Sequence, residues 1–249
     1  MEIAAFLQCF KNPYATYKCL ESFRRFYPTS TVVLLSDNGY NYSKMAEYFQ
    51  CIYIHCDKSA TFIHKDLDTG SHFLNTNKLI QRITSAFQLI KEDYIMWLED
   101  DVSVNGSISV PFRYDLNGYC PNIINRSSIQ LLAEKYRNID PNVAYRFTGH
   151  GGSVYKRTAL LECFDNKLAI DDVLTNWKIY GFPTTLCQDY FFSILLIING
   201  KTIGYYEGHG EKGRHDIDSN ILVQHQYKHW YGVPLPDQLA HLVSADPFY

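Results

Sequence analysis

The sequence predicts an α/β protein with three layers, in which helices cover both faces of a mainly parallel sheet. Two observations predict it. Up to residue 98, short apolar runs alternate with longer segments whose apolar residues recur at helical spacing, a pattern typical of parallel strands joined by crossover helices. In addition, 46% of the 249 residues are hydrophobic, which is enough for a large core. No linker or internal repeat divides the chain, so we expect a single domain over residues 1–249.

In the first half, each expected strand is a short apolar or β-branched run that ends in a turn signal. Each expected helix has apolar residues three or four positions apart. The run Tyr94–Leu98 is typical of a strand buried on both faces, and it leads directly into Glu99-Asp100-Asp101. The expected strands are 3–9, 31–35, 51–55 and 94–98, and the expected helices are 14–27, 43–49 and 77–90.

The second half is less regular. Segment 102–125 contains two prolines and two glycines, so we expect a loop there. Residues 208–220 are polar and Gly-rich and are predicted to form a mobile loop. The expected strands of this half are 143–147 and 202–206, and the expected helices are 129–136, 158–164, 170–180 and 186–198.

The charge balance argues against one class of partner. The chain has 23 Lys and Arg and 26 Asp and Glu, a formal net charge of −3, whereas nonspecific nucleic-acid binding needs a basic excess to neutralise phosphates. The first residues lack the basic start and unbroken apolar stretch of a signal peptide. The longest apolar run, 191–198, is far shorter than the roughly 20 residues that span a bilayer. We therefore expect a soluble, cytoplasmic protein that has no transmembrane segment and binds no nucleic acid.

Polar side chains follow the expected strands at the points where they end. Asn12, Asp37 and the triplet Glu99-Asp100-Asp101 occupy these positions, and the carboxyl ends of parallel strands meet at one edge of a sheet, where ligands bind. Adjacent acids repel one another unless a cation or water satisfies them, and carboxylate oxygens are the ligands that Mn²⁺ and Mg²⁺ prefer. The triplet therefore predicts a divalent-metal site, with a solvated strand-end turn as the alternative.

Five short segments of the chain form an ordered series: 3–12, 32–39, YIMWLEDD at 94–101, GHGGS at 149–153 and QDYFF at 188–192. In their order and spacing, the chain resembles the GT-A glycosyltransferases over roughly residues 1–210. The resemblance implies a GT-A-type, Rossmann-like α/β/α sandwich with a mixed, mainly parallel sheet. It also implies a metal-dependent enzyme that moves a sugar from a nucleotide-sugar, most simply a UDP-sugar, to an acceptor hydroxyl. Residues 1–104 would then bind the nucleotide-sugar and residues 105–249 the acceptor.

The resemblance assigns roles to the strand-end residues. Asp101, the last acid of the Glu-Asp-Asp form of the Asp-x-Asp motif, would bind the metal that bridges the donor diphosphate. Glu99 and Asp100 would contact the ribose or the sugar, or orient the metal's ligands. Asp37 would accept a hydrogen bond from the base, and Asn12 would lie against the nucleotide.

Two further sets of residues are expected to bind the donor. Lys78 and Arg82 lie four apart on one predicted helix and therefore share a face. One of them would neutralise phosphate or hold the sugar, and an exposed helix face is the alternative. Gly151 and Gly152 let the backbone approach a ligand closely, and a tight strand–helix connection is the alternative.

Asp189 is the expected catalytic base. Direct displacement at the anomeric carbon needs a carboxylate that takes the proton of the acceptor hydroxyl, and this role implies inversion of configuration. Asp189 also begins an apolar helix, where an acid is favoured by the helix dipole alone. For the second metal ligand, the resemblance favours His225, which follows a strand-like stretch near the C-terminus, with His209 as the competitor.

Aromatic residues near the C-terminus are expected to contact the acceptor. Trp230 and Tyr231 would form a platform for its sugar, and core packing is the alternative. Lys212, Arg214 and His215 would close over the diphosphate, or belong to a solvated loop. Two other functions stay open for the chain. One is a sugar nucleotidyltransferase, although the Gly-rich basic segment that such an enzyme needs after its first strand is lacking, and the other is a non-catalytic carbohydrate-binding relative.

Overall fold

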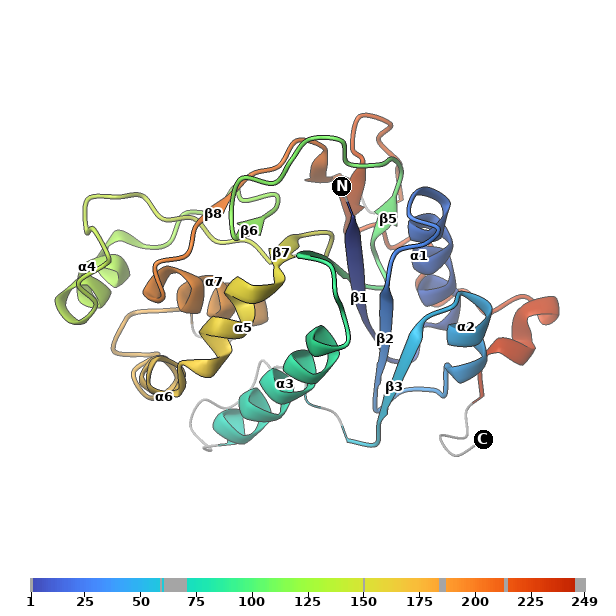
Figure 1. Cartoon of the computed structure of the whole chain (residues 1–249), viewed down its shortest axis with the longest axis horizontal. Coiled ribbons are helices and arrows are strands. Elements are labelled where there is room, and N and C mark those ends of the chain that lie inside the picture. Colours follow the sequence, from blue (N-terminus) through green and yellow to red (C-terminus); the bar gives the residue numbers. More distant parts are fainter. Residues whose placement is uncertain are drawn as a thin grey trace.

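The computed structural model describes residues 2–58, 60, 71–149, 151–183, 187–212 and 215–244. The described chain forms a seven-stranded sheet in the order β3-β2-β1-β4-β7-β6-β8, and a three-stranded sheet in the order β5-β10-β9 (Figure 1). The strands of the large sheet are β1 (Ile3–Cys9), β2 (Val32–Asp37), β3 (Ile52–Cys56), β4 (Tyr94–Leu98), β6 (Leu116–Asn117), β7 (Val154–Lys156) and β8 (Ile203–Gly204). Those of the small sheet are β5 (Ser103–Val104), β9 (His209–Glu211) and β10 (Val223–His225).

The large sheet is mixed, as predicted. Strands β1, β2, β3 and β4 run parallel, with Ala5 opposite both Val32 and Met96 in the register. Strand β7 is antiparallel to β4 and to β6, and β8 is parallel to β6. Because β1 lies between β2 and β4, the chain order reverses at β1, which is the place where open α/β sheets bind ligands.

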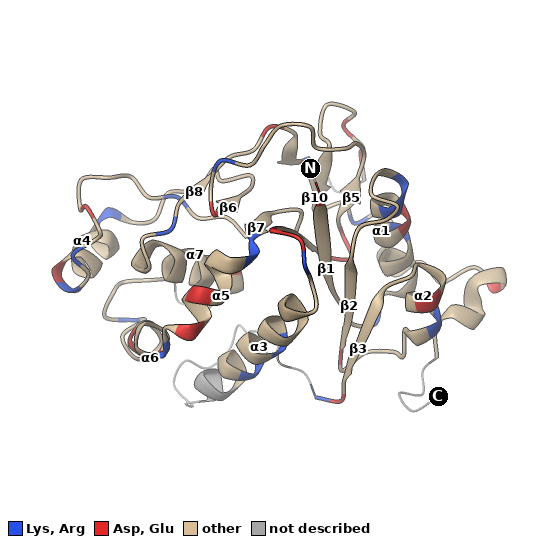
Figure 2. Ribbon diagram, in the orientation of Figure 1, with Lys and Arg blue, Asp and Glu red and all other residues tan. Residues whose placement is uncertain are grey.

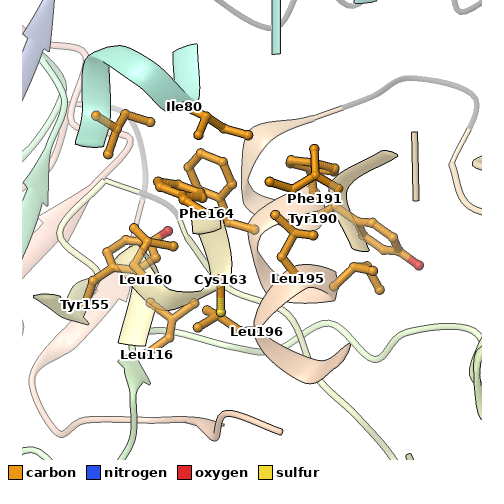
Figure 3. Packing of buried hydrophobic residues seen from close by; sticks show 14 of the residues in the cluster. Ile80, Leu116, Tyr155, Leu160, Cys163, Phe164, Tyr190, Phe191, Leu195 and Leu196 are labelled. Carbon is orange, nitrogen blue, oxygen red and sulfur yellow. The ribbon is translucent and has the colours of Figure 1, made fainter. Parts of the chain in front are cut away.

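Helices cover both faces of this sheet. Side chains of a strand alternate between faces, so Ala4 and Phe6 join one hydrophobic cluster while Ile3, Ala5 and Leu7 join the other. Figure 3 shows part of the first cluster, where Ile80, Phe164 and Phe191 from three helices pack together. This cluster includes residues of α3 (Ser71–Gln88), α4 (Arg126–Lys135), α5 (Arg157–Asp165), α6 (Lys167–Thr175) and α7 (Gln188–Ile198). The second cluster includes residues of α1 (Pro13–Phe26), α2 (Ser43–Tyr48) and the 3-10 helix η1 (Asp237–Leu242).

The structure corrects three predictions for the second half. Segment 143–147 is not a strand: Val143 is exposed, and in the described chain this segment makes only an isolated bridge, between Ile123 and Arg146. The strand beside β4 is β7, which follows the glycine-rich turn. The expected loop 102–125 contains β5 and β6, and the expected loop 208–220 contains β9. The predicted helix start at Leu186 lies outside the described residues.

Charged residues are mixed over the helices. In Figure 2, the ribbons of α1, α2, α4 and α6 each carry both acidic and basic residues. Among the helices described, none combines the length and the apolar character that a membrane span requires. The apolar helix α7 is instead buried within the protein, as Phe191, Leu195 and Leu196 in Figure 3 illustrate.

Candidate functional site

A cavity of about 520 Å³ lies at the carboxyl ends of β1, β2 and β4. Parallel strands bring their last residues to the same edge, so side chains far apart in sequence meet there. The predicted residues Asn12, Asp37, Glu99, Asp100 and Tyr231 all line it. The other lining residues are Gln8, Cys9, Phe10, Asn38, Trp97 and Gln188.

Asp100 lines this cavity together with Glu99, and its carboxylate is hydrogen-bonded to two neighbours. The side-chain amide of Asn12 donates to its Oδ2 at 2.9 Å, and the hydroxyl of Tyr231 donates to its Oδ1. Burial raises the pKa of Asp100, and these two hydrogen bonds oppose that rise because they favour the charged form. Through Tyr231, the C-terminal part of the chain is thereby hydrogen-bonded to the residues that follow β4.

Glu99, Asp101 and His225 offer ligand atoms that lie within 4.8 Å of one another. The Nε2 atom of His225 is 3.3 Å from Oε2 of Glu99 and 3.6 Å from Oδ1 of Asp101. Oδ1 of Asp101 is buried and accepts no hydrogen bond from the residues described, a costly arrangement unless a cation occupies the space beside it. Two carboxylates and an imidazole fit a divalent ion. We call these three residues the metal triad.

His225 carries the electrostatic signature of this cluster. Burial alone would lower the pKa of His225, but hydrogen bonds with Glu211 and Glu99 and the charge of Asp101 raise it to about 10. Its Nδ1 atom lies 2.7 Å from Oε1 of Glu211, the neighbour of His225 in the β10–β9 ladder. The carboxylate of Glu211 orients the imidazole ring so that Nε2 points to Glu99 and Asp101.

Lys228 is a site residue that the sequence did not reveal. Its Nζ atom lies 3.1 Å from Oδ2 of Asp101, and the backbone N–H of Tyr227 donates to the carbonyl of Asp101 at 2.9 Å. The position of Lys228 three residues after the expected ligand His225 was the available signal. It is weak, because only the tertiary fold brings this segment to the end of β4.

Asp37 and Arg82 were each predicted to bind the donor, and in the structure they form an ion pair with each other. Arg82 from α3 donates to Oδ1 of Asp37, and Gln8 donates to its Oδ2 at 3.1 Å. The backbone N–H of Ala60 also donates to Oδ1, at 3.0 Å. Arg82 thus anchors the carboxylate at the end of β2. Lys78 is not among the described residues that line the cavity.

The glycine turn, which contains Gly149, Gly151 and Gly152, packs against the metal triad. Gly152 has φ +91°, a conformation that favours glycine, and its N–H donates to the carbonyl of Trp97 at 2.6 Å. A Cβ atom on Gly151 would lie 2.9 Å from Cδ2 of His225 and 3.2 Å from Cβ of Glu99. Gly151 therefore makes room for His225 and Glu99 of the triad, and Gly152 makes room for Val223 and His209.

His209, the alternative candidate for a metal ligand, forms hydrogen bonds with the backbone of Tyr119 and of the glycine turn. The backbone N–H of Tyr119 donates to Nδ1 of His209 at 2.8 Å, so the ring proton lies on Nε2, which donates to the carbonyl of Gly151 at 3.0 Å. Both ring nitrogens are therefore occupied, and the described cluster of ligand atoms contains His225 and not His209.

Asp189 lies in the first turn of α7, beside the glycine turn. A Cβ atom on Gly149 would lie 3.1 Å from Cβ of Asp189, and the charge of Asp189 contributes to raising the pKa of Glu99, after the larger effect of burial. The neighbour Gln188 lines the cavity, whereas Asp189 is not among the lining residues described. Asp189 thus lies near Glu99 of the metal triad but is not among the described residues that line the cavity.

Trp230 and Tyr231 are separated by the structure. Trp230 packs against Tyr14 of α1, and the Lys18 ammonium lies 5.4 Å from its ring centroid. It lines a different cavity, between α1 and segment 217–230. Lys212 pairs with Asp218 at 3.0 Å, and Arg214 lies outside the described residues. Of the predicted aromatic pair, Tyr231 lines the site cavity and Trp230 lines the other cavity.

The fold matches that of GT-A-type glycosyltransferases. The galactosyltransferase LgtC, solved with donor and acceptor sugar analogues, is similar with TM-score 0.52 and 12% identity over 97% of this chain and 100% of LgtC. The apo-form of the glycosyltransferase GlyE of Streptococcus pneumoniae is similar with TM-score 0.50 and 12% identity over 91% of this chain. The chain spans about half of GlyE, 54% of its length. No protein-family model and no curated protein sequence matches the chain.

Proposed function

We propose that this protein is a glycosyltransferase that moves a sugar from a nucleotide-sugar, most simply a UDP-sugar, to an acceptor hydroxyl. The observation that carries the proposal is the metal triad, in which the buried Oδ1 of Asp101 accepts no hydrogen bond from the residues described, placed beside the cavity at the chain reversal of a GT-A-type sheet. The similar enzyme LgtC is a galactosyltransferase that was solved with donor and acceptor sugar analogues, which supports sugar transfer as the reaction of this protein.

Asp101, His225 and Glu99 would hold the divalent ion, Mn²⁺ or Mg²⁺. When bound, the ion neutralises the charge that develops on a departing nucleoside diphosphate. Asp37 and Asn12 line the cavity near the end of β1 and β2 and are suited to bind the nucleoside, and Asp100 lies between Asn12 and Tyr231.

Lys228 supplies a second positive charge at the same place. Its ammonium pairs with Asp101 in the described structure, and it can turn from that carboxylate to a phosphate oxygen because its side chain is long and partly exposed. In this role Lys228 binds the leaving group and stabilises its charge in the transition state.

Asp189 remains our choice for the base, with inversion of configuration as the consequence. Its carboxylate would accept the proton of the acceptor hydroxyl while that oxygen attacks the anomeric carbon and the diphosphate leaves. Gln188, which lines the cavity, would donate its amide N–H groups to the donor sugar. The two residues begin the same helix, so one backbone segment would position donor and base together.

A nucleotide-sugar panel tests the proposed activity. Release of nucleoside diphosphate is measured with Mn²⁺ and with EDTA for the wild type, for Asp101→Asn and for the control Asp140→Asn, an exposed acid outside the cavity. We expect turnover of one UDP-sugar, and a loss of about 100-fold with EDTA or Asp101→Asn. Full turnover in EDTA rejects the metal site. Pyrophosphate release from a nucleoside triphosphate and a sugar phosphate indicates a nucleotidyltransferase, and metal-independent sugar binding without turnover indicates a lectin-like relative.

The stereochemistry is tested separately. The anomeric configuration of the product is read by NMR for the wild type, and turnover is compared for Asp189→Asn and Gln188→Ala. Inversion together with loss of transfer in Asp189→Asn, while binding of UDP is kept, supports the base. Retention of configuration, or full turnover of Asp189→Asn, removes Asp189 from the reaction.

A further inference from the structure

Strand β8 forms the edge of the large sheet opposite β3 (Figure 1). A further cavity, of about 500 Å³, is lined by residues of β8 and by residues that precede and follow β6. Its volume is in the range of small-molecule sites. Tyrosines are the main side chains of its wall, and none of its residues lines the site cavity. We call it the tyrosine groove, and it is lined by Tyr114, Tyr119, Cys120, Pro121, Arg146, Ile203, Gly204 and Tyr205.

Tyr114 is held rigidly although its side chain is exposed. The fully buried side chain of Asn117 accepts a hydrogen bond from the N–H of Tyr114 at 3.1 Å and donates to its carbonyl at 2.7 Å. The ring lies so close to β8 that any Cβ atom on Gly204 would collide with it. Tyr114 nevertheless remains 37% exposed. The structure thus fixes an aromatic ring against the sheet edge without burying it.

Tyr205 and Arg146 complete the chemistry of the groove. Tyr205 is 53% exposed. Both hydrogen bonds that Arg146 makes with described residues use Nη1, to the carbonyls of Cys120 at 3.0 Å and Pro121 at 3.1 Å, and Nε and Nη2 can donate to a ligand. Fixed aromatic faces beside guanidinium and phenol donors suit a molecule with apolar C–H faces and a rim of hydroxyls, which is the chemistry of a sugar.

A series of contacts that begins at Tyr119 connects the tyrosine groove with the metal triad. Tyr119 of the groove donates its N–H to His209 and accepts a hydrogen bond at its carbonyl from Thr148 Oγ1 at 2.8 Å. His209 in turn donates to the carbonyl of Gly151, which packs on His225. Gly151 of the glycine turn therefore contacts both His209, which is bonded to the tyrosine groove, and His225 of the metal triad.

We propose that the tyrosine groove binds sugar residues of the acceptor glycan, at a distance from the hydroxyl that accepts the transferred sugar. This inference rests on the proposed glycosyltransferase function. A glycan that reaches from the groove past the glycine turn would present its terminal residue to the site cavity, so the groove would select acceptors by length and composition.

A glycan array, followed by titration of the bound oligosaccharide, tests the groove directly. Binding is measured in EDTA and without nucleotide for the wild type, Tyr114→Ala, Tyr205→Ala, Arg146→Gln and the control Tyr48→Ala, an exposed tyrosine on α2. We expect each groove variant to bind about tenfold more weakly and Tyr48→Ala to bind as the wild type does. Tyr205→Phe, which keeps the ring, should retain binding and shows that the fold is intact. Absence of glycan binding by the wild type, or unchanged binding by both alanine variants of the groove, overturns the proposal.

Asp101→Asn separates this proposal from the proposed function. The variant should lose sugar transfer and keep glycan binding. Glycan binding at the groove in a protein without transferase activity refutes the transferase and leaves the groove as a carbohydrate site. Transferase activity whose KM for long acceptors is unchanged in Tyr205→Ala and Tyr114→Ala refutes the groove alone.

Discussion

At the scale of single residues, the site is governed by charge that the protein does not neutralise by itself. Glu99, Asp101 and Glu211 surround the imidazole of His225, and Asp101 also pairs with the ammonium of Lys228. A divalent ion held by Glu99, Asp101 and His225 would replace the proton of His225 and compete with Lys228 for Asp101.

Lys228→Gln is expected to separate metal binding from catalysis. Removal of an ammonium that pairs with Asp101 should tighten binding of Mn²⁺ alone by about tenfold, because a competing cation beside the ligand is lost. The same variant should transfer sugar more slowly, because the leaving diphosphate loses a positive partner. Calorimetric titration of Mn²⁺ and turnover at saturating donor measure the two effects. Weaker Mn²⁺ binding by Lys228→Gln contradicts the role as competitor.

Gly151→Ala is expected to damage the metal triad. A Cβ atom there would lie 2.6 Å from Cγ2 of Val102 and 2.9 Å from Cδ2 of His225, so the imidazole or the turn must move, at a cost of about 1–3 kcal/mol. Weaker Mn²⁺ binding and a lower free energy of unfolding should follow. Gly210→Ala is the control, because a Cβ atom there meets only the side chain of Ile221, at 3.2 Å or more. Equal Mn²⁺ affinity in both variants would show that Gly151 does not position His225.

The sequence predicted individual site residues better than their partners. Asp101 and His225 were assigned from a motif and from a resemblance in placement, and the structure brings both into one cluster. The Asp37–Arg82 pair and the Lys228 contact were missed because each joins segments far apart in sequence. The different surroundings of Trp230 and Tyr231 were not predictable for the same reason: Tyr231 lines the cavity while the ring of Trp230 packs on α1.

At the scale of elements, long periodic segments were predictable and short strands were not. The strand predicted at 94–98 matches β4, and the helix predicted at 77–90 overlaps α3, since each has a strong apolar pattern, but α3 begins six residues earlier, at Ser71, and ends at Gln88. Strand β7 has only three residues, Val154–Lys156, and its antiparallel place beside β4 depends on the glycine turn that precedes it. Local propensity favoured 143–147 instead, but Val143 remains exposed and finds no strand partner among the described residues.

Helices α4 and α6 are joined by a buried carboxylate, which leads to a prediction about pH. Asp172 of α6 accepts hydrogen bonds from Lys135, from Tyr136 at 2.5 Å and from Tyr180 at 2.7 Å. Burial would raise the pKa of Asp172, but these partners and Asn176 lower it below its usual value. Since the folded pKa is lowered, this stabilisation is complete above the unfolded pKa of about 4 and is lost as the pH falls through the folded value.

Asp172→Asn should therefore lower the free energy of unfolding by about 1–3 kcal/mol at pH 7, because the charged acceptor of several hydrogen bonds is lost. The difference from the wild type should shrink as the pH falls below about 4, where the wild-type carboxyl also becomes neutral. Urea unfolding at pH 7 and at lower pH values measures this. The control Asp140→Asn changes an exposed acid, and a difference for Asp172→Asn that stays constant with pH contradicts the explanation.

At the scale of the whole molecule, the site depends on chain segments that are distant in sequence. Glu99 and Asp101 follow β4, His225 ends β10, and Gln188 begins α7. The two predicted halves, 1–104 and 105–249, therefore both contribute to one metal triad. A ligand that binds across them is expected to stabilise the native state as a whole, since unfolded chain offers no such arrangement.

Thermal unfolding with Mn²⁺, with UDP, and with both together measures this coupling. Ligand at about 100 times its dissociation constant adds about 2.7 kcal/mol, which for a chain of this length raises Tm by about 5–10 °C. If the metal triad anchors the diphosphate, the two ligands together should raise Tm by more than the sum of their separate effects. Asp101→Asn should lose this excess while UDP alone keeps its smaller effect, because Asn12 and Asp37 line a part of the cavity that the substitution does not touch. Additive shifts in the wild type would mean that nucleotide and metal bind independently, and the triad would then not serve the donor.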